Sequence, residues 1–388
     1  MAPERKLPAK EDHRVQSGDK VDYPFLFLVL LLLAVGLTML YSASYAQSQY
    51  DTGYESTVKY LQKQAACAAI GLAAMYVFSR IPVAFWFRFA WPLYFFSILL
   101  LLSVLVIGQE VNGARRWINI AGIQFQPSEV AKFAMILIFA RLTRSFGPDA
   151  RQFRFGVLGF GTALMGILIP LALEKHLSAF MLMGMVAVVM MFVAGTSPKW
   201  LLAGAGAAAV FVVIYITLMG YAGDRVTAWL HPELDPGDTG YQILQSLYAI
   251  GSGGIFGLGF GKSRQKYLYL PFQYNDYIFA ICCEELGLAG ACGIILLFSL
   301  AITRGYWIAL HAADRFSTVL AAGLVTLIAV QTILNLCVVT NLLPSTGVAL
   351  PFFSYGGTAL AVNLGEMGIV LQISRQKNKE KRQEDFSL

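Results

Sequence analysis

Residues 23–46 read YPFLFLVLLLLAVGLTMLYSASYA and contain no charged side chain. An α-helix rises about 1.5 Å per residue, so about 20 apolar residues are enough to cross the hydrocarbon core of a bilayer. In that core, where water is absent, a single segment satisfies its own backbone hydrogen bonds only as a helix. This stretch therefore predicts a transmembrane helix.

Comparable apolar segments recur along the rest of the chain. Ten can be marked, at about 23–46, 62–79, 84–107, 127–143, 155–173, 177–195, 200–220, 276–302, 317–341 and 350–373. The sequence does not show the alternating strands of about ten residues that are typical of a transmembrane barrel. We predict an all-α polytopic membrane protein with about ten transmembrane helices.

The composition of the whole chain agrees with this fold class. Of the 388 residues, 57% are hydrophobic and 13% are charged, and the mean hydropathy is +0.61. An average soluble domain has about 25% charged residues, so the values exclude a soluble two-domain enzyme and a disordered chain. The five cysteines lie inside apolar segments without disulfide or metal-site spacing, and we interpret them as packing residues.

Positive charge is concentrated at the two ends of the chain, which has a net charge of +6. We expect basic tails at residues 1–21 and 375–388, on either side of a transmembrane domain at 22–374. With the amino terminus inside, 19 Lys and Arg residues face the cytoplasm and 9 face outward, while Lys132 lies within a span. This imbalance predicts that both termini are cytoplasmic. Contact with anionic lipid explains the tails better than nucleic-acid binding does.

Two predicted outer segments, 108–126 and 221–275, are long enough to carry function. The larger one is rich in glycine and aromatic residues, so we expect it to fold against the bundle. It contains AIGSGGIFGLGFGKS at 249–263, followed by further basic residues. Backbone N–H groups freed by glycine, beside Lys262, Arg264 and Lys266, could hold a phosphate. A flexible, closely packed loop is the alternative.

Acidic residues mark the start of the eighth predicted span. Asp276 lies in LPFQYNDYIF (270–279), where burial would favour a general base. From the residues alone, a helix N-cap formed by Asn275 or Asp276 is the preferred interpretation. Glu284 and Glu285 lie further along the same helix. We favour structural pairing for them over direct chemistry, with Lys132 or polar groups of the last two spans as candidate partners.

Other polar residues interrupt the apolar segments at helical spacing. Glu129 and Lys132 in QPSEVAK (126–132) share a helix face, so an ion pair is expected. Arg115 and Arg116 in NGARRWI (112–118) suit phosphate recognition or, equally, a solvated turn. Two further pairs, expected to form hydrogen bonds between helices, are Gln331 with Asn335 and Asn363 with Glu366. The break at 344–357 is tolerated in a membrane only where it packs or lines a cavity.

Taken together, five motifs resemble the SEDS family (shape, elongation, division and sporulation), whose members polymerise the glycan strands of peptidoglycan. They are NGARRWI, QPSEVAKF, DTGYQILQSLYAIGSGGIFGLGFGKSRQKYLYLP, NDYIFAICCEELG and PSTGVALPFFSYGGT, and they occur in the family's order. The resemblance covers about residues 20–375. The stretches 22–46 and 365–376 look more like the division branch, FtsW, than the elongation branch, RodA.

The resemblance implies a fold of ten helices with a large extracytoplasmic loop between helices 7 and 8. It also implies that Asp276 is the catalytic carboxylate, which reverses the preference for a cap. The implied substrate is lipid II, a disaccharide-peptide on undecaprenyl diphosphate. Asp276 would deprotonate the acceptor hydroxyl. The cations available to meet the leaving diphosphate are Arg115, Arg116, Lys132, Lys262 and Lys266.

The resemblance leaves open a divalent cofactor such as Mg²⁺. It implies a class B penicillin-binding protein, a single-pass transpeptidase, as partner, together with other divisome membrane proteins. It places the protein in the bacterial plasma membrane with the active site on the outer face. Nucleic acid is not an expected partner.

Two positions depart from the family pattern. Many members carry Pro-Asp-Leu-Gly where this chain has Lys175, His176, Leu177 and Ser178, and many carry Glu where it has Phe272. Both changes put local contacts to substrate or metal in doubt, but neither removes Asp276. Two other functions stay open, a flippase for the lipid-linked precursor and a noncatalytic scaffold of the division complex.

Overall fold

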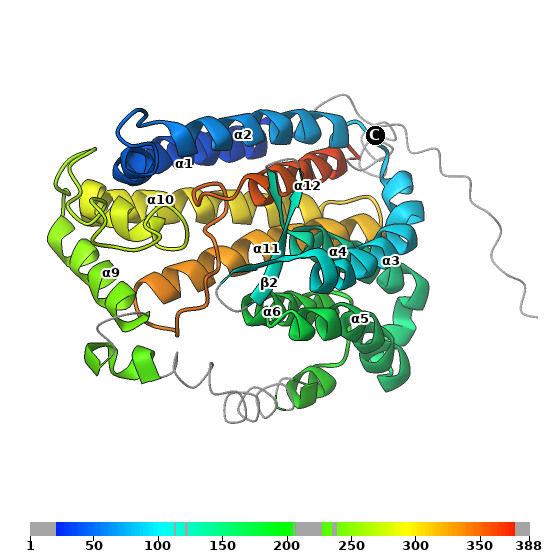
Figure 1. Cartoon of the computed structure of the whole chain (residues 1–388). Helices are drawn as coiled ribbons and strands as arrows, with labels where there is room; N and C mark the ends of the chain where they lie inside the picture. Colours follow the sequence, from blue (N-terminus) through cyan, green and yellow to red (C-terminus); the bar gives the residue numbers. More distant parts are fainter. Residues whose placement is uncertain are drawn as a thin grey trace, which may run out of the picture.

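The apolar segments fold into long helices that lie side by side (Figure 1). This computed structural model describes residues 21–111, 114–120, 123–204, 206, 227–234 and 239–376. The helices of the first half are α1 (Tyr23–Asp51), α2 (Lys59–Phe78), α3 (Val83–Ile107), α4 (Pro127–Phe146), α5 (Phe160–Leu173) and α6 (Leu177–Val193). Those of the second half are α9 (Thr239–Gly253), α10 (Ile278–Leu310), α11 (Arg315–Val339) and α12 (Gly357–Arg375).

Within the described residues, a helix lies at nine of the ten predicted apolar segments. The seventh segment, 200–220, lies mostly outside them, as do nearly all of both predicted tails and parts of the 221–275 loop. In the described part, six helical segments are long and apolar enough to cross a membrane: α1, α2, α3, Arg154–Leu173, α10 and α11. The mostly helical membrane fold is therefore confirmed.

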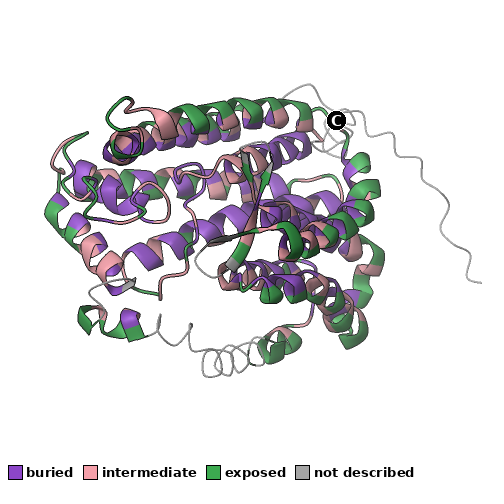
Figure 2. Cartoon of the chain, viewed as in Figure 1, coloured by how far each residue is buried: buried purple, intermediate pink, exposed green. Residues whose placement is uncertain are grey.

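The burial pattern separates inner from outer helices (Figure 2). Most of α11 and α12 and the middle of α4 are buried, which explains why α4 and α12 can carry charged side chains. By contrast, α2 and α3 expose large apolar residues such as Tyr76, Phe95 and Leu99, as expected for helices that face lipid.

Close backbone contact joins α2 to α12, which come from opposite ends of the sequence. A Cβ on Gly368 would collide with the carbonyl oxygen of Met75, and one on Gly71 would lie 2.7 Å from Leu364 Cδ1. Small residues at helix interfaces let backbones approach, because packing rather than the hydrophobic effect holds helices together in lipid. The amino-terminal hairpin is thus fixed against the last helix.

The contacts define two ends of the bundle. At one end, Asp22 binds Arg304 (2.8 Å) and Ser374, and Arg144 pairs with Asp314 (3.5 Å). We call this the basal end. We call the other one the site end, because it carries Asp276; there α1 and α3 finish and α2, α4 and α12 begin.

The segment 108–126 contains a small antiparallel sheet that the sequence analysis did not predict. Its strands are β1 (Gln109–Val111), β2 (Ala114–Ile120) and β3 (Ile123–Phe125), in the order β1-β2-β3. Glu110 pairs with Arg115, and Asn119 pairs with Gln124. The sheet places its two arginines at the site end, next to the start of α4.

Candidate functional site

Asp276 lies in the turn just before α10 and is half-buried. The helix itself begins at Ile278, its N-cap residue is Tyr277, and it has no side-chain cap hydrogen bond. The interpretation of Asn275 or Asp276 as a helix cap is therefore wrong. What holds the turn in place instead is a set of contacts from the carboxy-terminal part of the chain.

Three consecutive carbonyl groups in this turn each accept a hydrogen bond from that part. Tyr274 O accepts from Tyr355 N (2.9 Å), and Asn275 O accepts from Ser354 Oγ (2.6 Å). Asp276 O accepts from Asn335 Nδ2 (2.7 Å), which also donates to Val348 O (2.8 Å). We call these three donors the carbonyl clamp. It fixes the backbone of the acid from three sides, so its side chain points in a defined direction.

The segment 344–356 faces the carboxylate of Asp276. Gly347 has a φ of +69°, and a Cβ there would lie 3.2 Å from Asp276 Oδ2. Next to it, Thr346 O accepts a hydrogen bond from Ser178 at the start of α6. The predicted break at 344–357 is therefore packed, and it connects Asp276 to the link between α5 and α6.

A second group of charges gathers at that link. Lys132 and Glu129, both buried on the first turns of α4, form the predicted ion pair at 2.7 Å. Arg116 Nη2 donates to Lys175 O (2.7 Å). Burial raises the pKa of Glu174 to about 8, although Arg116 opposes the shift. Burial, with the charges of Arg116 and Lys132, lowers the pKa of His176 to about 3, so this histidine is neutral.

The predicted arginine pair is divided between two partners. Successive side chains of a strand point to opposite faces, and Arg115 Nη1 donates to Leu105 O at the end of α3 (3.1 Å). Arg116 instead reaches the α5–α6 link. The structure thus brings Arg116, rather than both arginines, to the charge group of Lys132.

Of the four polar residues predicted to form hydrogen bonds between helices, Asn335 instead donates to carbonyl groups of two non-helical segments, at Asp276 and Val348. Side-chain oxygens of Gln331, Asn363 and Glu366 are buried and have no hydrogen-bond partner in the described part of the chain. The charges of Lys132 and Glu129 act on Glu366, which places these three groups near one another. The interior next to Lys132 therefore contains buried polar oxygens that no hydrogen bond of the described residues satisfies.

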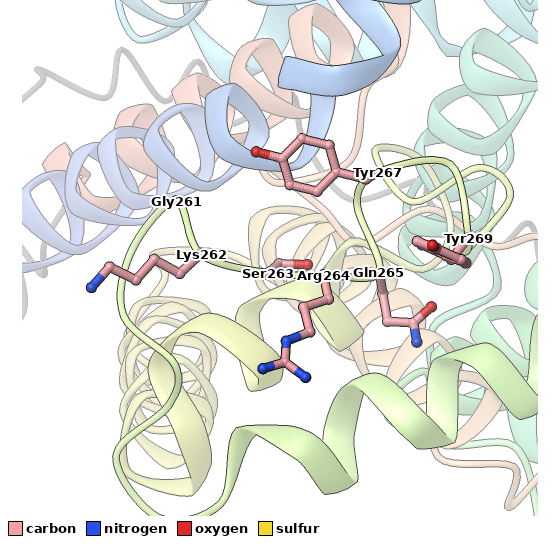
Figure 3. A pocket seen from close by; sticks show the side chains of 7 residues that line it. All are labelled: Gly261, Lys262, Ser263, Arg264, Gln265, Tyr267 and Tyr269. Atoms are coloured by element: carbon pink, nitrogen blue, oxygen red, sulfur yellow. The ribbon is translucent and has the colours of Figure 1, made fainter.

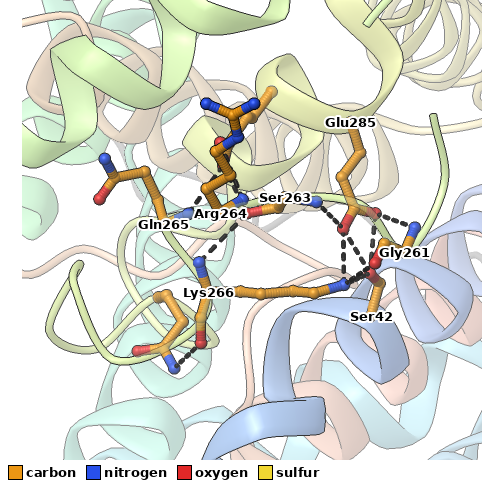
Figure 4. A network of polar contacts seen from close by, with 9 residues as sticks. Ser42, Gly261, Ser263, Arg264, Gln265, Lys266 and Glu285 are labelled. Carbon is orange, nitrogen blue, oxygen red and sulfur yellow. Dashed lines mark hydrogen bonds and ion pairs between the residues drawn. The ribbon is translucent and has the colours of Figure 1, made fainter. Parts of the chain in front are cut away.

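Glu284 and Glu285 are held by the loop 261–266 (Figure 4). Glu284 accepts from Ser263 Oγ and from the backbone N–H of Arg264 (2.9 Å). Glu285 accepts from Gly261 N (3.0 Å) and from Ser42 Oγ (2.6 Å), and it pairs with Lys266 Nζ at 3.0 Å. We call this loop and the two acids the carboxylate nest. Structural pairing is confirmed, but the expected partners, Lys132 and the last two spans, were wrong.

The carboxylate nest also changes the predicted phosphate site. Backbone N–H groups freed by glycine do surround an anion, but that anion is the chain's own pair of carboxylates. The side chain of Lys266 is 2% exposed and is fully engaged with Glu285, Ser42 and Gly261 O. In this arrangement Lys266 has a structural contact in place of the substrate contact that we predicted.

Helix α10 is interrupted just after these acids. Gly287 has φ 67° and ψ −169°, so the carbonyl groups before it lose their helical partners. The glycine-rich stretch 254–259 replaces them: Leu258 N donates to Glu284 O (2.9 Å) and Gly259 N to Glu285 O (3.0 Å). Leu288 N in turn donates to Gly254 O (2.9 Å). Within AIGSGGIFGLGFGKS, the non-helical stretch 254–259 is thus a docking segment for a broken helix.

An open pocket of about 740 Å³ lies on the outer side of the carboxylate nest (Figure 3). Its lining residues are Gly261, Lys262, Ser263, Arg264, Gln265, Tyr267 and Tyr269. The predicted site residue Lys262 therefore lies on a pocket wall, whereas Lys266 lies buried behind it. The described residues include no group of three or more His, Cys, Asp or Glu side chains suited to a metal ion. Mg²⁺ commonly binds through one or two carboxylates together with substrate phosphates, so a divalent cofactor stays a prediction of the resemblance, and we derive no step through it.

Sequence reasoning missed several residues of this end. The sequence placed Ser354 and Tyr355 of the carbonyl clamp only in a break, and it did not indicate the cluster of tilted and edge-to-face rings formed by Tyr60, Tyr274 and Tyr355. Tyr60 also donates to Asp51 at the end of α1. A polar residue such as Asn335 inside an apolar span was the one signal available, since clamp contacts join positions far apart in sequence.

Residues 23–379 match the family model for FtsW, RodA and SpoVE, described as a cell cycle protein. A probable peptidoglycan glycosyltransferase FtsW of Geobacter sulfurreducens is 37% identical over 364 residues, which cover 93% of this chain and 96% of the relative. The protein of the same name from Geobacter metallireducens is 40% identical, with coverage of 89% and 94%. Stage V sporulation protein E of Bacillus subtilis is 38% identical, with coverage of 91% and 97%.

Solved structures share the fold. One comes from a study of the structural coordination of polymerization and crosslinking by a peptidoglycan synthase complex; it is 28% identical, covers 93% of this chain and 100% of its own, and has a TM-score of 0.79. The rod shape determining protein RodA of Thermus thermophilus is 26% identical, with coverage of 93% and 99% and a TM-score of 0.70.

Proposed function

Because the chain belongs to the FtsW, RodA and SpoVE family of cell cycle proteins, the SEDS family indicated by its motifs, we propose that it is a peptidoglycan glycosyltransferase of the division branch. It polymerises lipid II into glycan strands during septal cell-wall synthesis. Relatives named FtsW at 37–40% identity support the division branch over elongation. Beyond the family match, the observation that carries the proposal is the placement of Asp276 by the carbonyl clamp.

In the proposed reaction Asp276 is the general base. It accepts the proton of an acceptor sugar hydroxyl while that oxygen attacks the anomeric carbon of the donor. The bond between this carbon and the diphosphate oxygen breaks, and undecaprenyl diphosphate leaves with the electron pair. A base must be held still relative to the two sugars, because misplacement by about 1 Å can lower the rate about 100-fold. The carbonyl clamp supplies that rigidity.

The leaving diphosphate needs positive charge. We propose that Lys132, Arg116 and Arg115 meet it, since they lie at the site end and two of them gather at the α5–α6 link. Lys132 already faces Glu129, so its net charge is partly offset. His176, which stands at one of the two positions that differ from the family pattern, is neutral and adds no charge to this group. Phe272, the other departure, is exposed.

The orientation in the membrane is part of the same proposal. The basal end carries Arg144, Arg304 and Arg315, and with both tails its side of the chain holds 19 Lys and Arg residues against 9 on the side of Asp276. The positive-inside rule then places the basal end and both termini in the cytoplasm of a bacterial cell and the active site on the outer face. The prenyl tails of donor and acceptor stay in the bilayer while their head groups reach Asp276.

We further propose that the protein acts with a class B penicillin-binding protein and with other divisome membrane proteins. The similar structure from a complex that coordinates polymerisation with crosslinking supports such a transpeptidase partner. A polymerase on the outer face supplies new strands where a transpeptidase can join them.

The test uses the purified full chain with labelled lipid II. The wild type should form glycan chains, and Asp276→Asn should abolish them while lipid II binding and thermal stability are kept. Glu55→Gln removes an exposed acid at the same end and should be active. Normal chain formation by Asp276→Asn would reject the proposed base. Lipid transport without polymerisation by the wild type would favour the flippase, and neither activity would favour a scaffold.

A further inference from the structure

The carboxylate nest orients its loop so that alternate side chains point outward. Gly261 N, Ser263 and Lys266 turn inward to Glu284 and Glu285. Lys262 and Arg264 lie between them and are exposed, and their side chains form no hydrogen bond or ion pair with any described residue, although both backbones are hydrogen-bonded. Figure 3 shows both side chains extending away from the backbone of the loop. Because their backbone is fixed by buried carboxylates, the two positive charges are presented at set positions.

The same loop joins the lipid-facing surface of α10. Ala289 N donates to Ile255 O (3.0 Å), so the loop lies against the helix where it resumes after its break. Ile255 (64% exposed) and Phe256 (84%) adjoin Leu288 (60%) there, and the exposed residues Leu296 and Leu300 follow along α10. This apolar surface is continuous with a transmembrane helix, so the loop borders lipid rather than bulk water.

Charge and aromatic residues complete the pattern of a membrane boundary. Phe260, Tyr267 and Tyr269 are exposed around the two cations. Aromatic rings and basic side chains next to an apolar surface favour the head-group level, where Lys and Arg meet lipid phosphate. Among the described residues, no acidic side chain lines the pocket, and Glu284 and Glu285 lie buried behind it beside Lys266. The three cations Lys262, Arg264 and Lys266 and the two carboxylates of Glu284 and Glu285 leave a formal net charge of +1, and the two exposed charges of this group are both positive.

We propose that Lys262 and Arg264 bind the phosphate of a lipid head group at the membrane boundary of the pocket. The exposed apolar side chains of Ile255 and Phe256, which precede the pocket residues in the same loop, would contact the acyl or prenyl chain of the same lipid. Two sources share this chemistry: an anionic phospholipid and a prenyl diphosphate. The site goes beyond the proposed function, because it does not require Asp276 to be the catalytic base.

The experiment measures binding to the full chain in detergent micelles by microscale thermophoresis. The probes are dihexanoyl-phosphatidylglycerol, geranyl diphosphate, zwitterionic dihexanoyl-phosphatidylcholine and inorganic phosphate. The test variant is Lys262→Gln with Arg264→Gln. The matched control, Lys63→Gln with Lys199→Gln, removes the same net charge from two exposed positions. Thermal unfolding checks that both variants fold, as expected for side chains without contacts.

Loss of two cations should weaken binding of a lipid phosphate about 30-fold, while the control variant binds like the wild type. If the test variant loses binding of geranyl diphosphate alone, the ligand is a prenyl diphosphate. If it loses binding of phosphatidylglycerol alone, the ligand is a phospholipid. Loss of binding of both probes identifies a general lipid-phosphate site. Unchanged binding of both lipids by the test variant overturns the proposal. So does equal weakening in the control, or binding of inorganic phosphate as tight as that of the lipids.

Discussion

Asn335→Leu is the substitution that tests the carbonyl clamp most directly. It removes two hydrogen bonds of 2.7 and 2.8 Å from a side chain that is 1% exposed, and it leaves the carbonyl groups of Asp276 and Val348 without this donor. A buried carbonyl left unsatisfied costs about 1–3 kcal/mol, so we expect the free energy of unfolding to fall by about 3 kcal/mol. Release of the Asp276 backbone should lower kcat about 100-fold.

The assay follows glycan formation from labelled lipid II over a range of concentrations, so that kcat and KM are separated. A clamp that positions the base should lower kcat and leave KM nearly unchanged. Gln331→Leu is the matched control: it lies one turn earlier on α11, is buried, and its Oε1 has no partner. It should keep kcat within about twofold. If Asn335→Leu retains normal kcat, or if both variants lose kcat equally, the clamp does not position the base.

Three further predictions concern the rest of the site end. Lys266→Met should lower the free energy of unfolding by about 3–5 kcal/mol, because it leaves Glu285 buried without its cation. Adding Glu285→Gln should restore part of that loss. Chemical denaturation of the single and double variants measures both effects. Gly257→Ala should prevent docking of the loop on α10, because φ at Gly257 is +78° and a Cβ there would collide with the carbonyl of Glu285. Gly251→Ala is the control and should be tolerated, because a Cβ at Gly251 meets nothing within 4 Å. Limited proteolysis of the two variants compares how well the loop is docked. The pKa of Glu174 is about 8 in the folded state, against an ordinary value of 4.5, so the folded state binds the proton more tightly. The free energy of unfolding should therefore fall as the pH rises from about 4.5 to 8. Thermal unfolding across this pH range should show a weaker dependence on pH for Glu174→Gln than for the wild type.

The features that depend on local spacing could be predicted from the sequence. Apolar length located the helices, and the i, i+3 spacing on α4 predicted the ion pair of Glu129 with Lys132. The family motifs singled out Asp276. Its turn was misread as a cap from the residues alone, because a polar residue before an apolar run has the same pattern in both cases.

What could not be predicted depends on contacts between distant segments. The partners of Glu284 and Glu285 lie 20 residues away in the loop 261–266, at Arg264, and 243 residues away on α1, at Ser42, and helical periodicity does not predict such pairs. The helix break at Gly287 lies within a predicted span and could not be recognised from that span alone. The segment that replaces the lost helical hydrogen bonds, 254–259, lies much earlier in the sequence. The small sheet was missed because two of its three strands, β1 and β3, have only three residues each and carry little pattern.

The interrupted helix α10 also bears on how the chain enters the membrane during synthesis. The docking segment and Lys266 leave the ribosome before Glu284 and Glu285, so the groups that neutralise and bind these acids are already available when the acids emerge. An acidic side chain in an inserting helix otherwise costs up to about 3 kcal/mol. We expect residues 239–310 to integrate as one unit, so that a glycosylation-mapping reporter fused after Leu310 should lose correct orientation when 254–266 is replaced by a serine-rich linker.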